Sequence, residues 1–228
     1  EVLSLVTTEW CPYACSNERY GKGIVHDYLS YLLAKRNIRL QVEFYPWSRA
    51  IKLVEEGRRH GLLTAVHSEA PNLLFTETPT MSYQMCFFTR SDSKWQYQGT
   101  ESLQQKRLGV IADYGYGEPL DGYMASHERS QNVFALAGDN GLQRLLNMMQ
   151  KNRLDVVIDD VNVVAWFFAK KTGSGASAVR TGGCMSNNPF FIGFSPEWNK
   201  SRLLVDWLNK DLKLRENVRM LSNKIMPN

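Results

Sequence analysis

Aromatic and charged side chains recur in this 228-residue sequence just after short stretches that have the pattern of β-strands. Aromatic rings stack on small solutes, while carboxylates and a guanidinium form charge-assisted hydrogen bonds with them. Such residue types at strand ends predict contacts to a small molecule. The candidate positions are Trp10, Tyr13, Trp47, Arg49, His67, Glu69, Tyr114, Tyr116 and Asp160.

Structural roles compete with the binding role at several of these positions. Trp47 fits the first turn of a helix, where its ring would pack. Arg49 fits a solvated helix surface or an ion pair with Glu55 or Glu56. A lone histidine near a turn, such as His67, is more often only hydrogen-bonded.

The remaining polar candidates also have a structural alternative. Glu69 fits an exposed turn residue, and Tyr114 and Tyr116 flank glycines that shape a turn before a helix. Asp160 fits the N-cap of the helix that follows it, although Asp159 would serve equally well in that role.

The four cysteines permit two disulfides, and the sequence leaves three pairings open. We assume Cys11 with Cys15, which close a small ring if the chain turns at Pro12, and Cys86 with Cys184 across a long separation. A zinc site needs more ligands, and the histidines are scattered, so we expect no metal. No cofactor is expected, and no Ser-His-Asp or Cys-His order indicates a nucleophilic enzyme.

Composition excludes two classes of partner. The net charge is +4 with a pI near 8.8, but no block of Lys and Arg is present, so we expect no nucleic-acid binding. Apolar runs are too short for a membrane helix, so we expect no direct membrane insertion. No signal peptide is visible before EVLSLVTT, as in a cytosolic protein or in a secreted one after cleavage.

Apolar periodicity predicts an α/β protein with two units of similar order. In the first unit, strands are expected at 2–8, 40–45 and 62–66, with helices at 24–35 and 46–57, the latter stopped by Gly57. In the second unit, strands are expected at 107–111, 132–135 and 154–158, with a helix after the turn 113–117 and further helices at 140–150 and 160–170. Further strands are expected at 85–90 and 189–195, with a helical end at 199–223.

Two α/β lobes joined by extended segments predict a ligand cleft between them. In parallel α/β sheets, ligands sit beyond the C-terminal ends of the strands, where loops enter helices. The candidate residues all follow predicted strands, so we expect them to line that cleft.

The ordered set of short motifs along nearly the whole chain resembles the periplasmic solute-binding proteins of the polar amino-acid uptake type (family 3, type II periplasmic binding fold). It is similar to a divergent branch with W-x-P-Y early and P-W-x-R-A after the second strand. No single motif is specific, but their order is. The matching segments are Glu9 to Tyr13, Gly23 to Asp27, Pro46 to Ala50, Leu108 to Val110, Gly115 to Gly117, Arg153 to Asp160 and Pro189 to Pro196.

This resemblance implies a discontinuous first lobe at 1–86 plus 190–228, a second lobe at 91–185, and hinge strands at about 85–90 and 189–195. It implies a periplasmic monomer that closes over a small polar solute, an amino acid or related amine, and delivers it to an inner-membrane ABC transporter permease. The signal peptide would have been removed. An oxidising compartment would also favour the disulfides.

The chain departs from the family at the ligand-binding positions. The family's Thr-x-x-Arg, which holds the ligand carboxylate, is replaced by His67-Ser68-Glu69, and Arg49 is our candidate for the missing cation. The family's Gly-Thr pair is replaced by Tyr114-Gly115-Tyr116, while Asp160 stands where the family binds the ligand ammonium. Glu69 and Asp160 together suit a ligand with cationic groups.

Two other classes compete with the solute-binding protein. Some members of this fold are dehydratases, and Glu69 or Asp160 with His67 would be the candidate acid groups here. A sensor or ligand-binding domain is the other alternative. The chain ends at IMPN without a linker to a membrane helix, which favours a free-standing protein.

Overall fold

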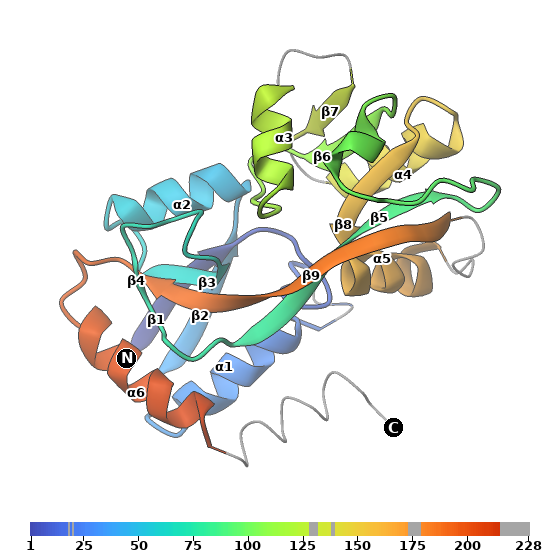
Figure 1. The fold of residues 1–228 in the computed structure, drawn as a ribbon. Coiled ribbons are helices and arrows are strands. Elements are labelled where there is room, and N and C mark those ends of the chain that lie inside the picture. The colour runs from blue at the N-terminus through green and yellow to red at the C-terminus, as the bar shows by residue number, and fades with distance from the viewer. Residues whose placement is uncertain (18, 20, 128–131, 138–139, 173–178, 215–228) are drawn as a thin grey trace. The chain divides into compact units, whose positions relative to one another are not determined.

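A computed structural model describes residues 1–17, 19, 21–127, 132–137, 140–172 and 179–214 (Figure 1). The chain forms two compact units. Unit 1 consists of Glu1–Ser82 with Pro189–Asn228, and unit 2 of Tyr83–Asn188. In the described residues, no helix is both long and apolar enough to cross a bilayer.

Unit 1 is built on three parallel strands. The central strand β1 (Val2–Thr7) pairs in parallel with β2 (Arg39–Phe44) and with β3 (Gly61–Ala65). The crossovers between them are α1 (Ile24–Ala34) and α2 (Trp47–Glu55). The final segment of the long strand β9 (Val179–Phe194) runs antiparallel to β3, β4 (Leu74–Phe75) pairs with β9, and α6 (Ser201–Leu212) follows (Figure 1).

The sequence explains these elements locally. Helix α1 buries one stripe at helical spacing, made of Val25, Tyr28, Leu29, Leu32 and Leu33. After α2, Gly57 adopts φ 69, the left-handed conformation that stops a helix, as predicted. A Cβ on Gly61 would lie 2.3 Å from the Gly193 carbonyl oxygen, so the absence of a side chain at Gly61 permits the close approach of β3 and β9.

Unit 2 repeats the arrangement with different strands. Strand β6 (Leu108–Ile111) pairs in parallel with β7 (Val133–Leu136) and β8 (Val156–Asp160), and β5 (Met81–Arg90) runs antiparallel to β8. A 3₁₀ turn (Thr100–Leu103) precedes β6. The helices are α3 (Leu120–Ser126), α4 (Gly141–Gln150) and α5 (Val161–Phe167), which continues as a π-helical turn (Phe168–Thr172). Leu145, Leu146 and Met149 of α4 pack on Val157 of β8 in one core.

The predicted elements are confirmed in type and order, but several bounds are wrong. The segment 189–195 is only the end of β9. The part of β9 that belongs to unit 2, including Gly182, Gly183 and the asparagines 187–188, lacks a strand pattern and is extended because it lies beside β5. Strand β5 begins at Met81, and the short strand β4 was not predicted. The helix expected at 199–223 spans Ser201–Leu212, and residues 215–223 lie outside the described residues.

Both assumed cysteine pairs are disulfides in the structure. Cys11 is bonded to Cys15 within the loop after β1. Cys86 is bonded to Cys184 and ties β5 to β9 across a sequence separation of 98 residues. Closing so long a loop restricts the unfolded chain, which stabilises the folded state.

A buried carboxyl group lies at the end of β8. Asp159 is 3% exposed, and its Oδ1 accepts a hydrogen bond from the Asp160 backbone N–H at 2.7 Å. Burial raises the pKa of Asp159 to about 7, and the neighbouring Asp160 charge adds to the rise. Asp159 therefore changes its charge near neutral pH inside the core of unit 2.

The raised pKa of this buried group predicts that Asp159→Asn becomes more stable relative to wild type as the pH rises. Between about pH 4 and pH 7 the folded chain keeps the Asp159 proton that the unfolded chain has lost, so this residue lowers the free energy of unfolding as the pH rises. The Asn variant has no such proton. Urea unfolding should show its stability relative to wild type rising by about 2–4 kcal/mol from pH 5 to pH 8. Asp113→Asn, the same change at an exposed position, is the control; parallel profiles for wild type and Asp159→Asn would contradict the prediction.

Candidate functional site

The three parallel strands of unit 1 place their following loops at one edge. Strands β1, β2 and β3 end at Thr7, Phe44 and Ala65, and parallel pairing brings these ends to the same side of the sheet. Six of the predicted site residues lie on these loops or on the first turn of α2: Trp10, Tyr13, Trp47, Arg49, His67 and Glu69.

The loop after β1 forms an aromatic cluster. It is closed by hydrogen bonds from Trp10 N to Ala14 O at 2.9 Å and from Ala14 N to Trp10 O at 3.0 Å. The rings of Trp10 and Tyr13 lie 4.4 Å apart, and Phe190 of β9 meets both edge-on at 5.4 and 5.5 Å. Tyr13 is 1% exposed, so its ring supports Trp10 from within the unit.

The two candidate residues on helix α2, Trp47 and Arg49, differ in burial. Trp47 is 5% exposed and packs inward from the first turn, which matches its structural alternative. Arg49 is exposed, and its guanidinium lies over the Tyr45 ring, 5.2 Å from the centroid. Glu56, one of the ion-pair partners considered for Arg49, pairs instead with other cations, Lys52 and Arg58.

His67 borders a hollow in unit 1. Its ring packs against Phe75 at 4.3 Å and Phe191 at 4.6 Å. The hollow has a volume of about 450 Å³, and α6 contributes Arg202 and Asp206 to its lining. Neither α6 residue was predicted, because nothing in the sequence links that helix to a turn more than a hundred residues earlier.

Glu69 closes its own turn. The Val66 backbone N–H donates to Glu69 Oε2 at 3.3 Å, and the Glu69 N–H donates to the Val66 carbonyl at 3.2 Å. The side chain is half-buried, so it is not a freely solvated turn residue. Its negative charge remains at this edge of unit 1.

In unit 2 the two tyrosines differ in burial. Tyr114 is partly exposed, whereas Tyr116 is fully buried, and its hydroxyl oxygen accepts from the Ile111 backbone N–H at 2.7 Å. The N–H groups of Tyr116 and Gly117 donate to the two carboxylate oxygens of Asp121, both at 2.9 Å. The backbone donors of this glycine turn are thus directed at Asp121, and Tyr116 fixes the turn to the end of β6.

Asp160 is held by three backbone donors. Its Oδ1 accepts from Asn162 N at 2.9 Å and Val163 N at 3.1 Å, and its Oδ2 accepts from Gln84 N at 2.9 Å. It is therefore the N-cap of α5, and the alternative that Asp159 caps this helix is wrong. The side chain is fully buried, so its carboxyl group is held in one position at the end of β8.

The charges at these loops are mostly negative. In unit 1 the loop segments are 8–15, 45–50 and 66–71. Their acidic residues are Glu9 and Glu69, and their basic residues are Arg49 and His67. In unit 2 the segments 112–119 and 159–162 carry neither Lys nor Arg, and their acidic residues are Asp113, Glu118, Asp160 and Asp159, whose raised pKa leaves it partly protonated near neutral pH. Such an excess of acidic groups favours ligands with cationic groups.

No protein-family model matches the chain, and no curated protein matches it by sequence. Solved structures do match. An ancestral arginine-binding protein bound to arginine has a TM-score of 0.78 at 14% identity, covering 100% of this chain and 98% of that one. A histidine kinase sensor domain with similarity to periplasmic binding proteins has a TM-score of 0.78 at 13% identity, covering 98% and 93%.

A third match is an amino acid ABC transporter substrate-binding protein from Streptococcus pneumoniae bound to L-arginine. Its TM-score is 0.73 at 13% identity, and the match covers 97% of this chain and 92% of that one. The likeness agrees with the two units and their parallel strands described above. The chain has the α/β, two-lobed fold of the periplasmic binding proteins.

Proposed function

We propose that this chain is a periplasmic solute-binding protein that closes over a small polar solute and delivers it to an ABC transporter permease. The observation that carries the proposal is the placement of aromatic and charged side chains at the C-terminal edge of the parallel strands in each unit. Solute binding of this kind needs neither a cofactor nor bond-making chemistry. The fold supports the same role, since solved structures with this fold bind amino acids.

The charges narrow the solute to an amino acid or related amine that carries an additional cationic group. Asp160 supplies a fixed carboxylate in unit 2, and Glu69 supplies a second negative group in unit 1. Arg49 is exposed and already oriented on the Tyr45 ring, so it is the candidate for binding a solute carboxylate. An ordinary anionic solute would meet more repulsion than attraction here.

The other proposed residues divide into contact and support. His67 is exposed and Tyr114 is partly exposed, and both would contact the solute, as would the edge of Trp10 that is 9% exposed. Tyr13, Trp47 and Tyr116 are buried, and they would hold those contacting groups and their loops in place. Support of this kind keeps a site preorganised, which lowers the entropy cost of binding.

Thermal unfolding in the presence of candidate solutes tests the proposed class. Arginine, ornithine, putrescine, glutamine, succinate and a dipeptide would each be added at the same concentration. A solute at 100 times its Kd stabilises by about 2.7 kcal/mol, which corresponds to roughly 5–10 °C for a chain of this size. We expect the cationic amino acids to give the largest shift. A shift with succinate alone would refute the cationic assignment.

Substitution of Arg49 tests its assignment to the carboxylate. Arg49→Ala should weaken binding of the best solute by about 10–100-fold, the value of a charge-assisted hydrogen bond, with little change in melting temperature because Arg49 is exposed. The matched variant is Arg202→Ala on α6, which also removes an exposed arginine. Isothermal titration would measure both. Loss of affinity in Arg202→Ala but not in Arg49→Ala would assign the solute to the hollow beside His67.

A ligand-sensing domain is the second candidate, favoured by the likeness to the histidine kinase sensor domain. Solute binding to the purified chain is expected for either function. Cellular uptake of the identified solute distinguishes them, because loss of a transporter's binding protein abolishes high-affinity uptake. If uptake persists without the chain while a response to the solute is lost, the sensor assignment is correct.

A further inference from the structure

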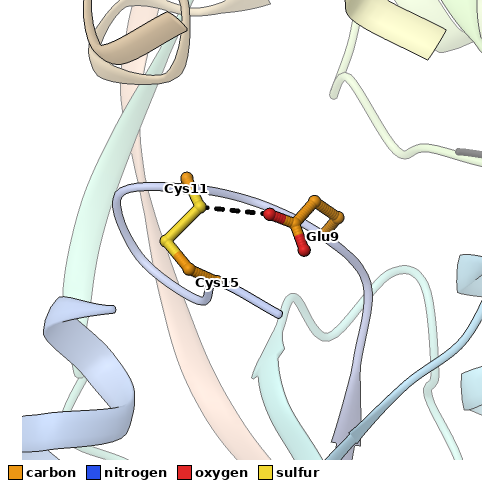
Figure 2. Close-up of side chains that lie close together, drawn as sticks. All are labelled: Glu9, Cys11 and Cys15. Atoms are coloured by element: carbon orange, nitrogen blue, oxygen red, sulfur yellow. Dashed lines mark hydrogen bonds between the residues drawn. A yellow bond between two sulfur atoms is a disulfide. The ribbon is translucent and has the colours of Figure 1, made fainter. Parts of the chain in front are cut away.

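Glu9, Cys11 and Cys15 gather three metal-ligand side chains in the loop after β1 (Figure 2). One carboxylate oxygen and the two sulfur atoms all lie within 4.8 Å of one another. The cysteines and histidines by themselves predict no metal site in the sequence. Glu9 was missed because carboxylates are common near loops and do not indicate a metal by themselves.

We propose that reduction of the Cys11–Cys15 disulfide creates a binding site for a thiophilic divalent cation of the zinc class, with Glu9, Cys11 and Cys15 as its protein ligands. In the disulfide form the two sulfur atoms are bonded to each other, and the site cannot bind the cation. Two thiolates and a carboxylate select such a cation over Mg²⁺ or Ca²⁺, which prefer oxygen ligands throughout. This inference does not depend on the proposed transport function.

The carboxylate of Glu9 is already positioned for this role. Its Oε2 accepts a hydrogen bond from the Ser16 backbone N–H at 2.8 Å, which fixes the group. Its Oε1 lies 3.1 Å from Cys11 Sγ, the contact dashed in Figure 2. A disulfide sulfur has no hydrogen to donate, so this contact becomes a hydrogen bond only when Cys11 is a thiol. The same oxygen is then available to a metal once the thiol has lost its proton.

The loop keeps the two cysteines close without the disulfide. Cys11 lies between Trp10 and Ala14, whose backbones are joined by two hydrogen bonds. Cys15 N donates to Lys22 O at 3.0 Å. The two Cα atoms are 5.0 Å apart. In a tetrahedral zinc site with Zn–S bonds of about 2.3 Å, the sulfurs stand about 3.8 Å apart, so side-chain rotation alone can open the bridge to that span.

A hollow beside Cys15 gives access and room for a fourth ligand. It has a volume of about 290 Å³, and its lining includes Cys15, Ser16 and His26. Cys11 and Cys15 are themselves only 4% and 3% exposed, which shields the sulfur ligands. Three protein ligands with one open position is the arrangement of accessible zinc sites, where water or a solute group completes the tetrahedron.

The redox step has a defined balance. A dithiol reductant transfers two electrons and two protons to the Cys11–Cys15 bond and leaves as its own disulfide. Binding of the cation then releases the two thiol protons, because the ligands are thiolates. The oxidised chain therefore lacks the site, and the reduced chain has it.

Titration of the full chain with cobalt(II) chloride tests the proposal. The protein would be reduced anaerobically with tris(carboxyethyl)phosphine, and an oxidised sample would be titrated in parallel. The reduced chain should bind a single equivalent, with sulfur-to-cobalt charge-transfer absorption that zinc chloride displaces. The oxidised chain should show no such absorption. Equal binding by both samples would overturn the proposal.

The matched variants separate this loop from the other cysteine pair. Cys11→Ser/Cys15→Ser retains Cys86 and Cys184, so it should lose the charge-transfer absorption entirely if the site is where we propose. Glu9→Gln should keep the absorption but weaken binding by at least about tenfold. Undiminished binding in the double-serine variant would refute the assignment, as would wild-type affinity in Glu9→Gln.

Loss of structure on reduction would not leave the proposal undecided. If reduction lowers the circular dichroism signal of the chain, zinc added to the reduced protein must restore it, because a cation that binds only the folded site favours the folded state. The double-serine variant must show no such recovery. A reduced chain that neither binds cobalt nor refolds with zinc would contradict the inference.

Discussion

The whole architecture rests on the parallel pairing of β1 with β2 and β3, and of β6 with β7 and β8. Parallel strands cannot be joined by tight turns, so the chain returns through a longer crossover between each pair. Every strand in the set then ends at the same edge of its sheet. Residues as far apart in sequence as Trp10 and Glu69 share one edge in unit 1 for this reason, and Tyr114 and Asp160 share one in unit 2.

An antiparallel strand lies next to the parallel strands in each unit: β9 pairs with β3 in unit 1, and β5 pairs with β8 in unit 2. In unit 1, β9 approaches β3 closely because Gly61 has no side chain, and the Gly193 carbonyl oxygen lies where a Cβ on Gly61 would clash. In unit 2, the polar first half of β9 is extended although its sequence has no strand pattern, and the Cys86–Cys184 bond fixes it to β5. Phe190 near the end of the same strand packs on Trp10 and Tyr13, so β9 also supports the aromatic loop.

The adjacent residues Asp159 and Asp160 at the end of β8 show how the position of a carboxyl group on the backbone decides its hydrogen bonds and its surroundings. Asp160 receives three backbone hydrogen bonds, two of them because it begins a helix whose first N–H groups are otherwise unpaired. Asp159, one position earlier, points into the core with a single backbone donor, and burial raises its pKa. The same side chain is thus a hydrogen-bonded helix cap at Asp160 and a group that titrates near neutral pH at Asp159.

From the sequence we could predict the α/β class, the type and order of nearly all helices and strands, and the strand ends at which the candidate residues would lie. These features follow from local periodicity and from turn residues such as Gly57, which act over a few positions. The sequence could not determine which candidates face inward: Trp47, Tyr116 and Asp160 proved buried, while Arg49 lies exposed on Tyr45. Nor could it associate Glu9 with the cysteines, Arg202 with His67, or the first half of β9 with β5. Those associations depend on contacts between distant segments or on how a loop folds back on itself, and only tertiary packing decides them.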